Sequence, residues 1–138
     1  MVHALNESWR VARAHVLDVR PRVGEPQVLV RDKNGRETIC GGLPWNGGDP
    51  EGHPPAEIAL SRVVAAGKFT VLAETQFDWI DSYGSADELA ESVSDDWVSR
   101  ELSEETALKL MRVMEEAGPG AMPFIRQPIG IRLLKKIV

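Results

Sequence analysis

The sequence predicts an α/β fold, a small mixed β-sheet with helices packed against it. Segments with apolar residues at helical spacing alternate along the chain with short apolar segments that are typical of strands. The 138 residues suit a single domain spanning 1–138. A chain of this length buries enough apolar surface to fold without a metal or a disulfide.

The first expected element is a helix over residues 4–13. Its apolar residues Leu5, Trp9 and Ala12 are spaced i, i+4 and i+7, which places them on one face.

A strand follows at residues 15–19 and ends before Pro21, because proline removes a backbone donor. The strand is almost continuously apolar, as expected of a strand buried on both faces, and Asp18 is its one interruption.

Residues 27–41 predict a β-hairpin, with strands at 27–31 and 37–41 around Asn34-Gly35. Asn-Gly is a strong hairpin signal because both residues tolerate positive φ. The loop 41–55 follows, in which nine residues are Gly or Pro.

A helix is expected from the Pro54-Pro55 pair to Ala65, with Gly67 as its C-cap. The next segment, residues 68–83, is the longest extended candidate.

Residues 85–118 predict a helical insertion of two helices. Ser85 and Glu88 form a capping box for the first, and Ser103 is the N-cap of the second. The last strand is expected at 124–134, where two prolines, Pro123 and Pro128, indicate an interruption or an edge near its start.

Composition excludes several classes of partner. Hydrophobic residues make up 43% and charged residues 27% of the chain, and the net charge is -5. An acidic balance argues against nucleic acid or an anionic membrane as the main partner. The single cysteine, Cys40, cannot form an internal disulfide, no apolar run is long enough to span a membrane, and the N-terminus lacks a signal-peptide core. We therefore expect a cytoplasmic protein.

Three stretches resemble class I S-adenosylmethionine-dependent methyltransferases. A-L-N-E-S-W-R-V followed by V-L-D-V-R-P, within residues 4–21, is similar to the helix and fifth strand of that family. F-D-W-I-D-S-Y at 77–83 and A-G-P-G-A at 117–121 are similar to a helical insertion and to the turn before the last strand. The resemblance implies the C-terminal half of a Rossmann-like fold, in which two C-terminal strands form an antiparallel finish to the sheet.

The chain departs from that family where the cofactor would bind. The glycine-rich loop E/D-x-G-x-G-x-G is absent, as is the acidic residue that holds the ribose. The glycines at 41, 42, 47 and 48 lie in a proline-rich loop after a hairpin, outside any strand-to-helix turn that could hold a phosphate. We therefore expect no bound cofactor.

Six residues are candidates for a substrate or ligand site. The carboxylates on the long strand could do acid–base work in an apolar setting, although solvent-facing positions on an amphipathic strand are the simpler explanation. The aromatic residues could line a pocket or belong to the core. The candidates are Trp45, Glu74, Asp78, Trp79, Asp81 and Tyr83.

No catalytic or metal-binding constellation is expected. The histidines His3, His15 and His53 lack ligand partners at i+3 or i+4. We expect Cys40 to be a buried, inert thiol. The basic residues 132, 135 and 136 are expected to be a solvated strand end.

The strand at 15–19 is expected at an edge of the sheet. A long apolar edge is an aggregation hazard unless another chain covers it. We therefore expect a homodimer through this strand and the helix 4–13, or a partner chain that carries the cofactor-binding half.

These patterns leave three functional hypotheses open. The first is a non-catalytic interaction or ligand-binding protein that lacks the S-adenosylmethionine site. The second is the substrate-side half of a split methyltransferase, and the third is a fragment of a longer one.

Overall fold

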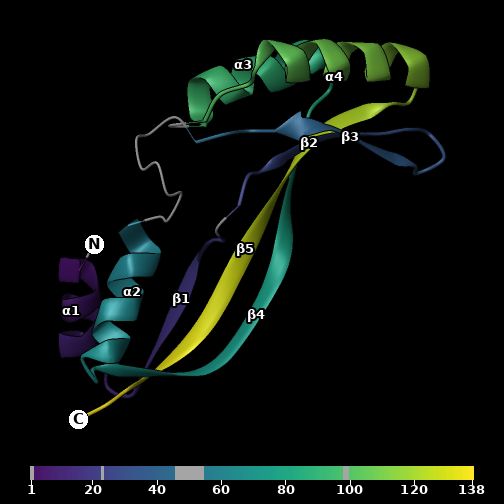
Figure 1. Cartoon of the computed structure of the whole chain (residues 1–138). Helices are drawn as coiled ribbons and strands as arrows, with labels where there is room; N and C mark the ends of the chain where they lie inside the picture. Colours follow the sequence, from purple (N-terminus) through teal and green to yellow (C-terminus); the bar gives the residue numbers. More distant parts are fainter. Residues whose placement is uncertain (1, 23, 46–54, 98–99) are drawn as a thin grey trace. The chain divides into compact units, whose positions relative to one another are not determined.

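The computed structural model describes residues 2–22, 24–45, 55–97 and 100–138 (Figure 1). They form a mixed α/β structure of four helices and a five-stranded, largely antiparallel sheet. In chain order the elements are α1 (Val2–Val11), β1 (His15–Pro21), β2 (Gln27–Arg31), β3 (Glu37–Gly42), α2 (Pro55–Ala65), β4 (Phe69–Ser82), α3 (Ala86–Asp96), α4 (Glu104–Ala117) and β5 (Met122–Lys136). None of the described helices is both long enough and apolar enough to cross a membrane.

The last strand, β5, organises the sheet. It pairs antiparallel with β1 over residues 129–135 and with β2 over residues 122–126, and it also pairs with β4. The hydrogen-bonded order is β1-β5-β2-β3, with β4 branching from β5. β1 therefore lies at the end of this order, as the sequence predicts.

The chain forms two compact units. The first contains residues 1–23, 49–77 and 129–138, and the second contains residues 24–48 and 78–128. The boundary falls inside β4, after Phe77, and inside β5, after Pro128.

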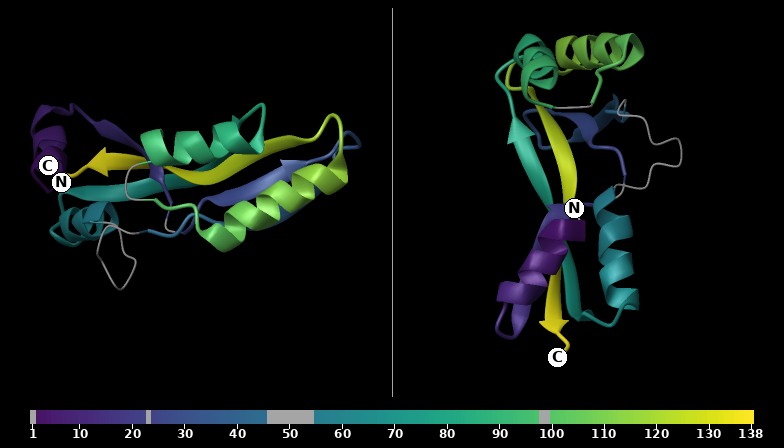
Figure 2. Two further views of the ribbon diagram at one scale, coloured as in Figure 1. Left: turned by 90° about the horizontal axis from the view of Figure 1, so that it is seen from above. Right: turned by 90° about the vertical axis from the view of Figure 1, so that its left-hand side faces the viewer.

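In the first unit, α1 and α2 lie on one face of the strands β1, β5 and β4 (Figures 1 and 2). Their apolar residues bury a small core against the sheet, because each helix has one apolar stripe to cover. This core consists of Leu5, Ala59, Leu60, Val63, Phe69 and Leu134. Trp9 extends it, and its indole donates to the backbone oxygen of Ile137 over 3.1 Å.

In the second unit, α4 contacts β2 and β3 and packs against α3. The buried core here consists of Val28, Val30, Cys40, Leu43, Leu89, Val93, Leu110, Val113 and Ile125.

The predicted hairpin and helix caps are confirmed. β2 and β3 pair antiparallel, and Gly35 in the turn has a φ of 84°. The hydroxyls of Ser85 and Ser103 accept from the backbone N–H groups of Glu88 and Thr106, as N-caps do. The predicted loop 41–55 lies largely outside the described residues.

Two predictions are corrected. β1 is not buried on both faces, because α1 and α2 cover only one: Leu17 is 62% exposed and Val19 is 53% exposed. β5 is continuous through both prolines. Its pairing is interrupted only on the side that faces β1 and β2, at residues 127–128. Proline has no backbone N–H, but Pro128 has no partner residue on that side, so no hydrogen bond is lost there.

The closest approach between α4 and β3 depends on Gly41. A β-carbon at this position would collide with the Thr106 hydroxyl and lie 2.8 Å from its methyl group. We expect Gly41→Ala to lower the free energy of unfolding by about 1–3 kcal/mol, the usual cost of overpacking. Urea denaturation measures this change.

The neighbouring Gly42 gives a matched control. A β-carbon there would meet the end of the flexible Glu25 side chain, which can move away, so Gly42→Ala should cost much less. Combining Gly41→Ala with Thr106→Ala should recover part of the loss, and strict additivity of the two changes would contradict the proposed clash.

Candidate functional site

A cluster of charged side chains lies on the helix-covered face of the first unit. Arg132 of β5 donates to Glu57 of α2 over 3.0 Å and to Glu74 of β4 over 2.7 Å. It also lies 3.7 Å from Asp18 of β1, whose other partner is Arg20. Two arginines thus meet three carboxylates from four different elements.

Strand pairing brings these groups together. Asp18 is directly opposite Arg132 in the β1–β5 register, and opposite residues of an antiparallel pair point to the same face. The first turn of α2 adds Glu57 from above that face. The Asp18 and Arg132 side chains are 11% and 15% exposed, so their charges are stabilised mainly by their ion-pair partners, Arg20 for Asp18 and Glu57 with Glu74 for Arg132.

The electrostatics follow from these contacts. The hydrogen bond that Arg132 donates to Glu57 raises the pKa of Arg132 above its ordinary value, and the bond to Glu74 acts in the same direction against the effect of burial. Two buried atoms, Asp18 Oδ2 and Arg20 Nη1, lack hydrogen-bond partners among the described residues. The interruption at Asp18 noted in the sequence is therefore one member of an ionic network.

The prediction that Arg132 belongs to a solvated strand end is wrong, because its side chain lies under α2 and takes part in this network. The sequence does not show which residues of the two strands lie opposite each other. A charged residue in each strand was therefore the one indication that Asp18 and Arg132 could pair. Lys135, by contrast, is exposed as predicted.

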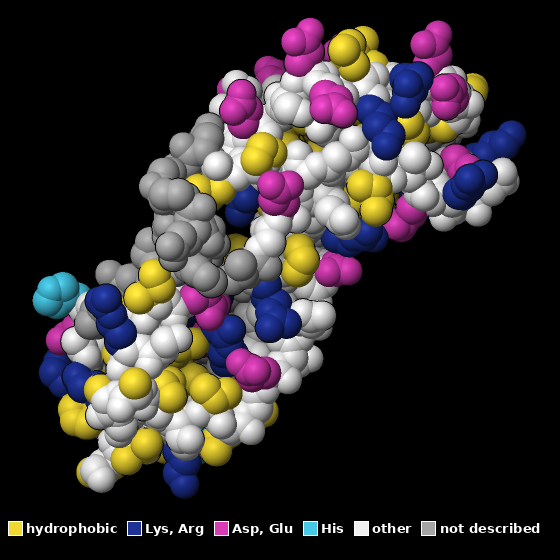
Figure 3. All heavy atoms as spheres, in the orientation of Figure 1, with side chains coloured by type: hydrophobic (Ala, Val, Ile, Leu, Met, Phe, Trp, Pro, Cys, Tyr) yellow, Lys and Arg dark blue, Asp and Glu magenta, His cyan; other side chains and the backbone are white. Residues whose placement is uncertain are grey.

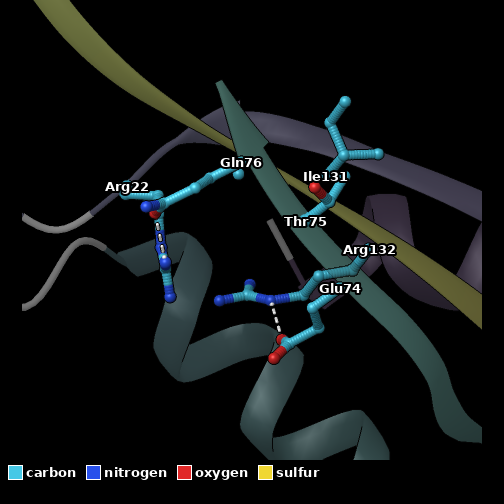
Figure 4. Close-up of a pocket in the computed structure, with 7 residues that line it drawn as sticks. Arg22, Glu74, Thr75, Gln76, Ile131 and Arg132 are labelled. Atoms are coloured by element: carbon cyan, nitrogen blue, oxygen red, sulfur yellow. Dashed lines mark hydrogen bonds and ion pairs between the residues drawn. The ribbon is translucent and has the colours of Figure 1, made fainter. Parts of the chain in front are cut away.

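A small open pocket of about 290 Å³ borders the network (Figure 4). It is lined by Arg22, Glu74, Thr75, Gln76, Gly130, Ile131 and Arg132. Glu74 and Arg132 point to one side of the strands, toward a helix, while Thr75 and Ile131 point to the other side (Figure 4).

Gly130 makes room for the arginine at this pocket. A β-carbon at Gly130 would lie 3.0 Å from Cγ of Arg22, so the arginine stem crosses the strand where there is no side chain. The guanidinium of Arg22 then donates to the Gln76 side-chain oxygen over 2.6 Å.

Of the six residues predicted for a ligand site, only Glu74 lines this pocket. Asp78 and Trp79 belong to the second unit, and both are exposed. The structure does not bring the six together in one pocket among the described residues.

Tyr83 and Asp81 interact with each other in the second unit. The Tyr83 hydroxyl donates to Asp81 Oδ2 over 2.8 Å and lies 3.0 Å from the Ser92 hydroxyl. Burial raises the pKa of Tyr83 above its ordinary value. These bonds tie the end of β4 to α3 and give Tyr83 a structural role.

Trp45 is 50% exposed and forms an isolated β-bridge with Arg100. The guanidinium carbon of Arg100 lies 5.2 Å from the centre of the Trp45 ring, and Arg100 also donates to the backbone oxygen of Leu43. This cation–π contact accounts for the position of Trp45 without a ligand.

The remaining candidates show no reactive arrangement. Cys40 is buried, as predicted, and burial raises the pKa of its thiol, which disfavours the nucleophilic thiolate. His3 and His15 are exposed, and His53 lies outside the described residues. No group of three or more potential metal ligands occurs among the residues described.

The second feature with functional potential is the uncovered face of the β1–β5–β4 sheet. Leu17 and Val19 point to it, opposite Leu133 and Ile131 of β5. In the described part of the first unit, no helix covers this face (Figure 2). Acidic and basic side chains are interspersed over the face of the molecule drawn in Figure 3.

No family model matches this chain, and neither a curated protein nor a solved structure matches it. Its function is therefore argued from the residues and their geometry.

The ionic network makes a stability prediction. Arg132→Leu leaves Glu57 under α2 without its cation and leaves Asp18 with Arg20 alone, and we expect a loss of about 3 kcal/mol in the free energy of unfolding at neutral pH. Urea unfolding at neutral pH measures this loss.

An exposed arginine gives the control. Arg112 lies 3.9 Å from Glu116 and both side chains are more than half exposed, so Arg112→Leu should change stability by less than about 0.5 kcal/mol. Equal effects of the two substitutions would mean that the network contributes nothing beyond a surface ion pair.

Proposed function

We propose that this chain is a non-catalytic interaction domain that self-associates through the free edge of β1. The observation that carries the proposal is an edge strand with two large apolar side chains in solvent, Leu17 and Val19. Isolated exposed apolar residues are ordinary, but neighbouring ones on a strand with a free edge form a surface that another chain can cover.

The hydrogen-bond pattern specifies which groups of β1 are available. The N–H of Lys136 donates to the oxygen of Ala14, so positions 14, 16, 18 and 20 direct their backbone groups to β5. Positions 15, 17 and 19 therefore direct their N–H and C=O groups away from the sheet. Pro21 lies in the same outward series, where its missing N–H costs no bond to β5.

A two-fold pairing of β1 with β1 of a second copy would satisfy these outward groups. It would continue the antiparallel sheet across the dimer axis and bring the exposed apolar side chains of both copies next to each other. Helix α1 lies in the same unit as β1 and would flank this interface, with Val11, 63% exposed, as its apolar contribution.

The edge-pairing proposal makes a sharp prediction. Val19→Pro removes one outward N–H and leaves the ladder to β5 intact, so the variant should fold but dissociate, with an apparent dimer constant weakened at least about tenfold. Light scattering coupled to gel filtration over a concentration series gives the mass.

Val19→Ala is the matched control, because it shortens the side chain and keeps the N–H; this variant should remain dimeric. A wild-type chain that stays monomeric at every concentration tested would overturn the proposal. A Val19→Pro variant that folds and dimerises as well as wild type would also overturn it.

A second function has support from the order of the strands. β5 is antiparallel to β1, and hydrogen bonds link β5 to both ends of β4: Tyr83 N–H donates to Pro123 and Ile137 N–H donates to Lys68. β5 thus lies between β1 and β4. This order agrees with the two C-terminal strands that, according to the methyltransferase resemblance, form an antiparallel finish to the sheet. On this alternative, β1 and the uncovered face receive the cofactor-binding half from a partner chain or from a longer chain.

The two functions differ in their response to S-adenosylmethionine. Neither predicts binding to the chain alone, because the glycine-rich loop is absent from the sequence. The alternative predicts that calorimetry detects binding once a second polypeptide carrying that loop is added. Micromolar binding by the isolated chain would contradict both.

A further inference from the structure

The pocket between β4 and β5 contains one cation without a counterion. Arg22 lines it, and among the described residues no carboxylate lies within ion-pair distance of this guanidinium. Its one side-chain partner is the amide oxygen of Gln76, which is neutral. The other donor groups of the arginine fork remain available to a ligand.

Two neighbours orient the exposed side chain of Arg22. The aliphatic part of the Arg22 side chain lies over Gly130, where there is no side chain to block it. Its guanidinium donates a hydrogen bond of 2.6 Å to the side-chain oxygen of Gln76. A guanidinium held in this way loses less freedom when it binds, and its planar fork matches the two oxygens of a carboxylate.

The same pocket also contains an acidic group. Glu74 is 55% exposed, and its Oε1 accepts from Arg132 over 2.7 Å, so its other oxygen is the one that can accept from a ligand. Glu74 and Gln76 are two residues apart on β4, which separates their backbone positions by about 7 Å. The pocket therefore has a cation without a counterion at Arg22 and, at Glu74, a carboxylate that is paired with Arg132 through one oxygen and has its other oxygen open.

We infer that this pocket binds a small zwitterion, whose carboxylate pairs with Arg22 and whose ammonium group pairs with Glu74. A simple anion would leave the open oxygen of Glu74 without a partner, and a simple amine would leave Arg22 without a counterion. The two charges of the ligand must be several bonds apart to reach both ends. The cavity of about 290 Å³ suits an amino acid with its amine and carboxyl group on separate carbons, or a dipeptide.

γ-Aminobutyrate is a suitable probe because its two charges are separated by three methylene groups. Butyrate and n-butylamine each carry one of these charges on the same carbon chain. We expect γ-aminobutyrate to cause saturable amide shifts in ¹⁵N NMR spectra at Gln76, Gly130 and Ile131, which line the pocket. Butyrate and n-butylamine should bind at least about tenfold more weakly.

Variants separate the two ends of the pocket. Arg22→Gln and Glu74→Gln should each weaken γ-aminobutyrate binding at least about tenfold, and Arg22→Lys should retain part of it as a point charge. Arg36→Gln is the control, since this exposed arginine lies in the hairpin turn of the other unit. Urea unfolding of each variant shows whether the fold is kept. If Arg22→Gln does not fold, Arg22→Lys takes its place in testing whether binding depends on Arg22.

Three outcomes would overturn the inference. The first is the absence of saturable shifts in the wild-type chain, and the second is shifts that persist unchanged in Arg22→Gln. The third is butyrate binding as tightly as γ-aminobutyrate with no response to Glu74→Gln, which would mean that the pocket selects an anion only. None of these depends on whether the chain self-associates through β1.

Discussion

The antiparallel pairing of β5 with three other strands is the constraint on which the rest of the structure depends. β5 contributes to both compact units, through Leu134 in the core of the first and Ile125 in the core of the second. Its register with β1 also decides which charged residues meet, because it places Arg132 opposite Asp18. A shift by one residue would move each of these side chains to the other face of the sheet.

The two faces of the sheet in the first unit have different chemistry for this reason. The face under α1 and α2 carries an apolar core and, beside it, the ionic network and the pocket. The other face carries Leu17 and Val19 without a helix over them. A ligand site and a protein-binding surface can therefore exist on one three-stranded sheet, with Ile131 as a residue that belongs to both.

Local signals in the sequence predicted the elements well, because each depends on a few neighbouring residues. The N-cap hydroxyls of Ser85 and Ser103 and the glycine of the hairpin turn are cases in which chemistry within four residues decides the backbone. The predicted edge position of β1 also holds.

The site was predictable only in part, because it depends on contacts distant in sequence. Glu74 was singled out from its strand, but its partner Arg132 lies 58 residues away and was assigned to solvent. No sequence pattern indicated Arg22 as a site residue, because its position depends on the absence of a side chain at Gly130. The apolar run at residues 15–19 indicated burial on both faces, because composition does not say how many faces the helices cover.

Pro21 has a consequence for how far the sheet can grow. It is the fourth residue in the outward-facing series of β1 and has no N–H to offer, so an added strand finds complete backbone partners only at residues 15, 17 and 19. Such a short template fixes the register of a single incoming strand but supports few hydrogen bonds. The edge is thereby protected against the open-ended stacking of strands that leads to fibres, while it remains accessible to a partner whose side chains supply the additional affinity.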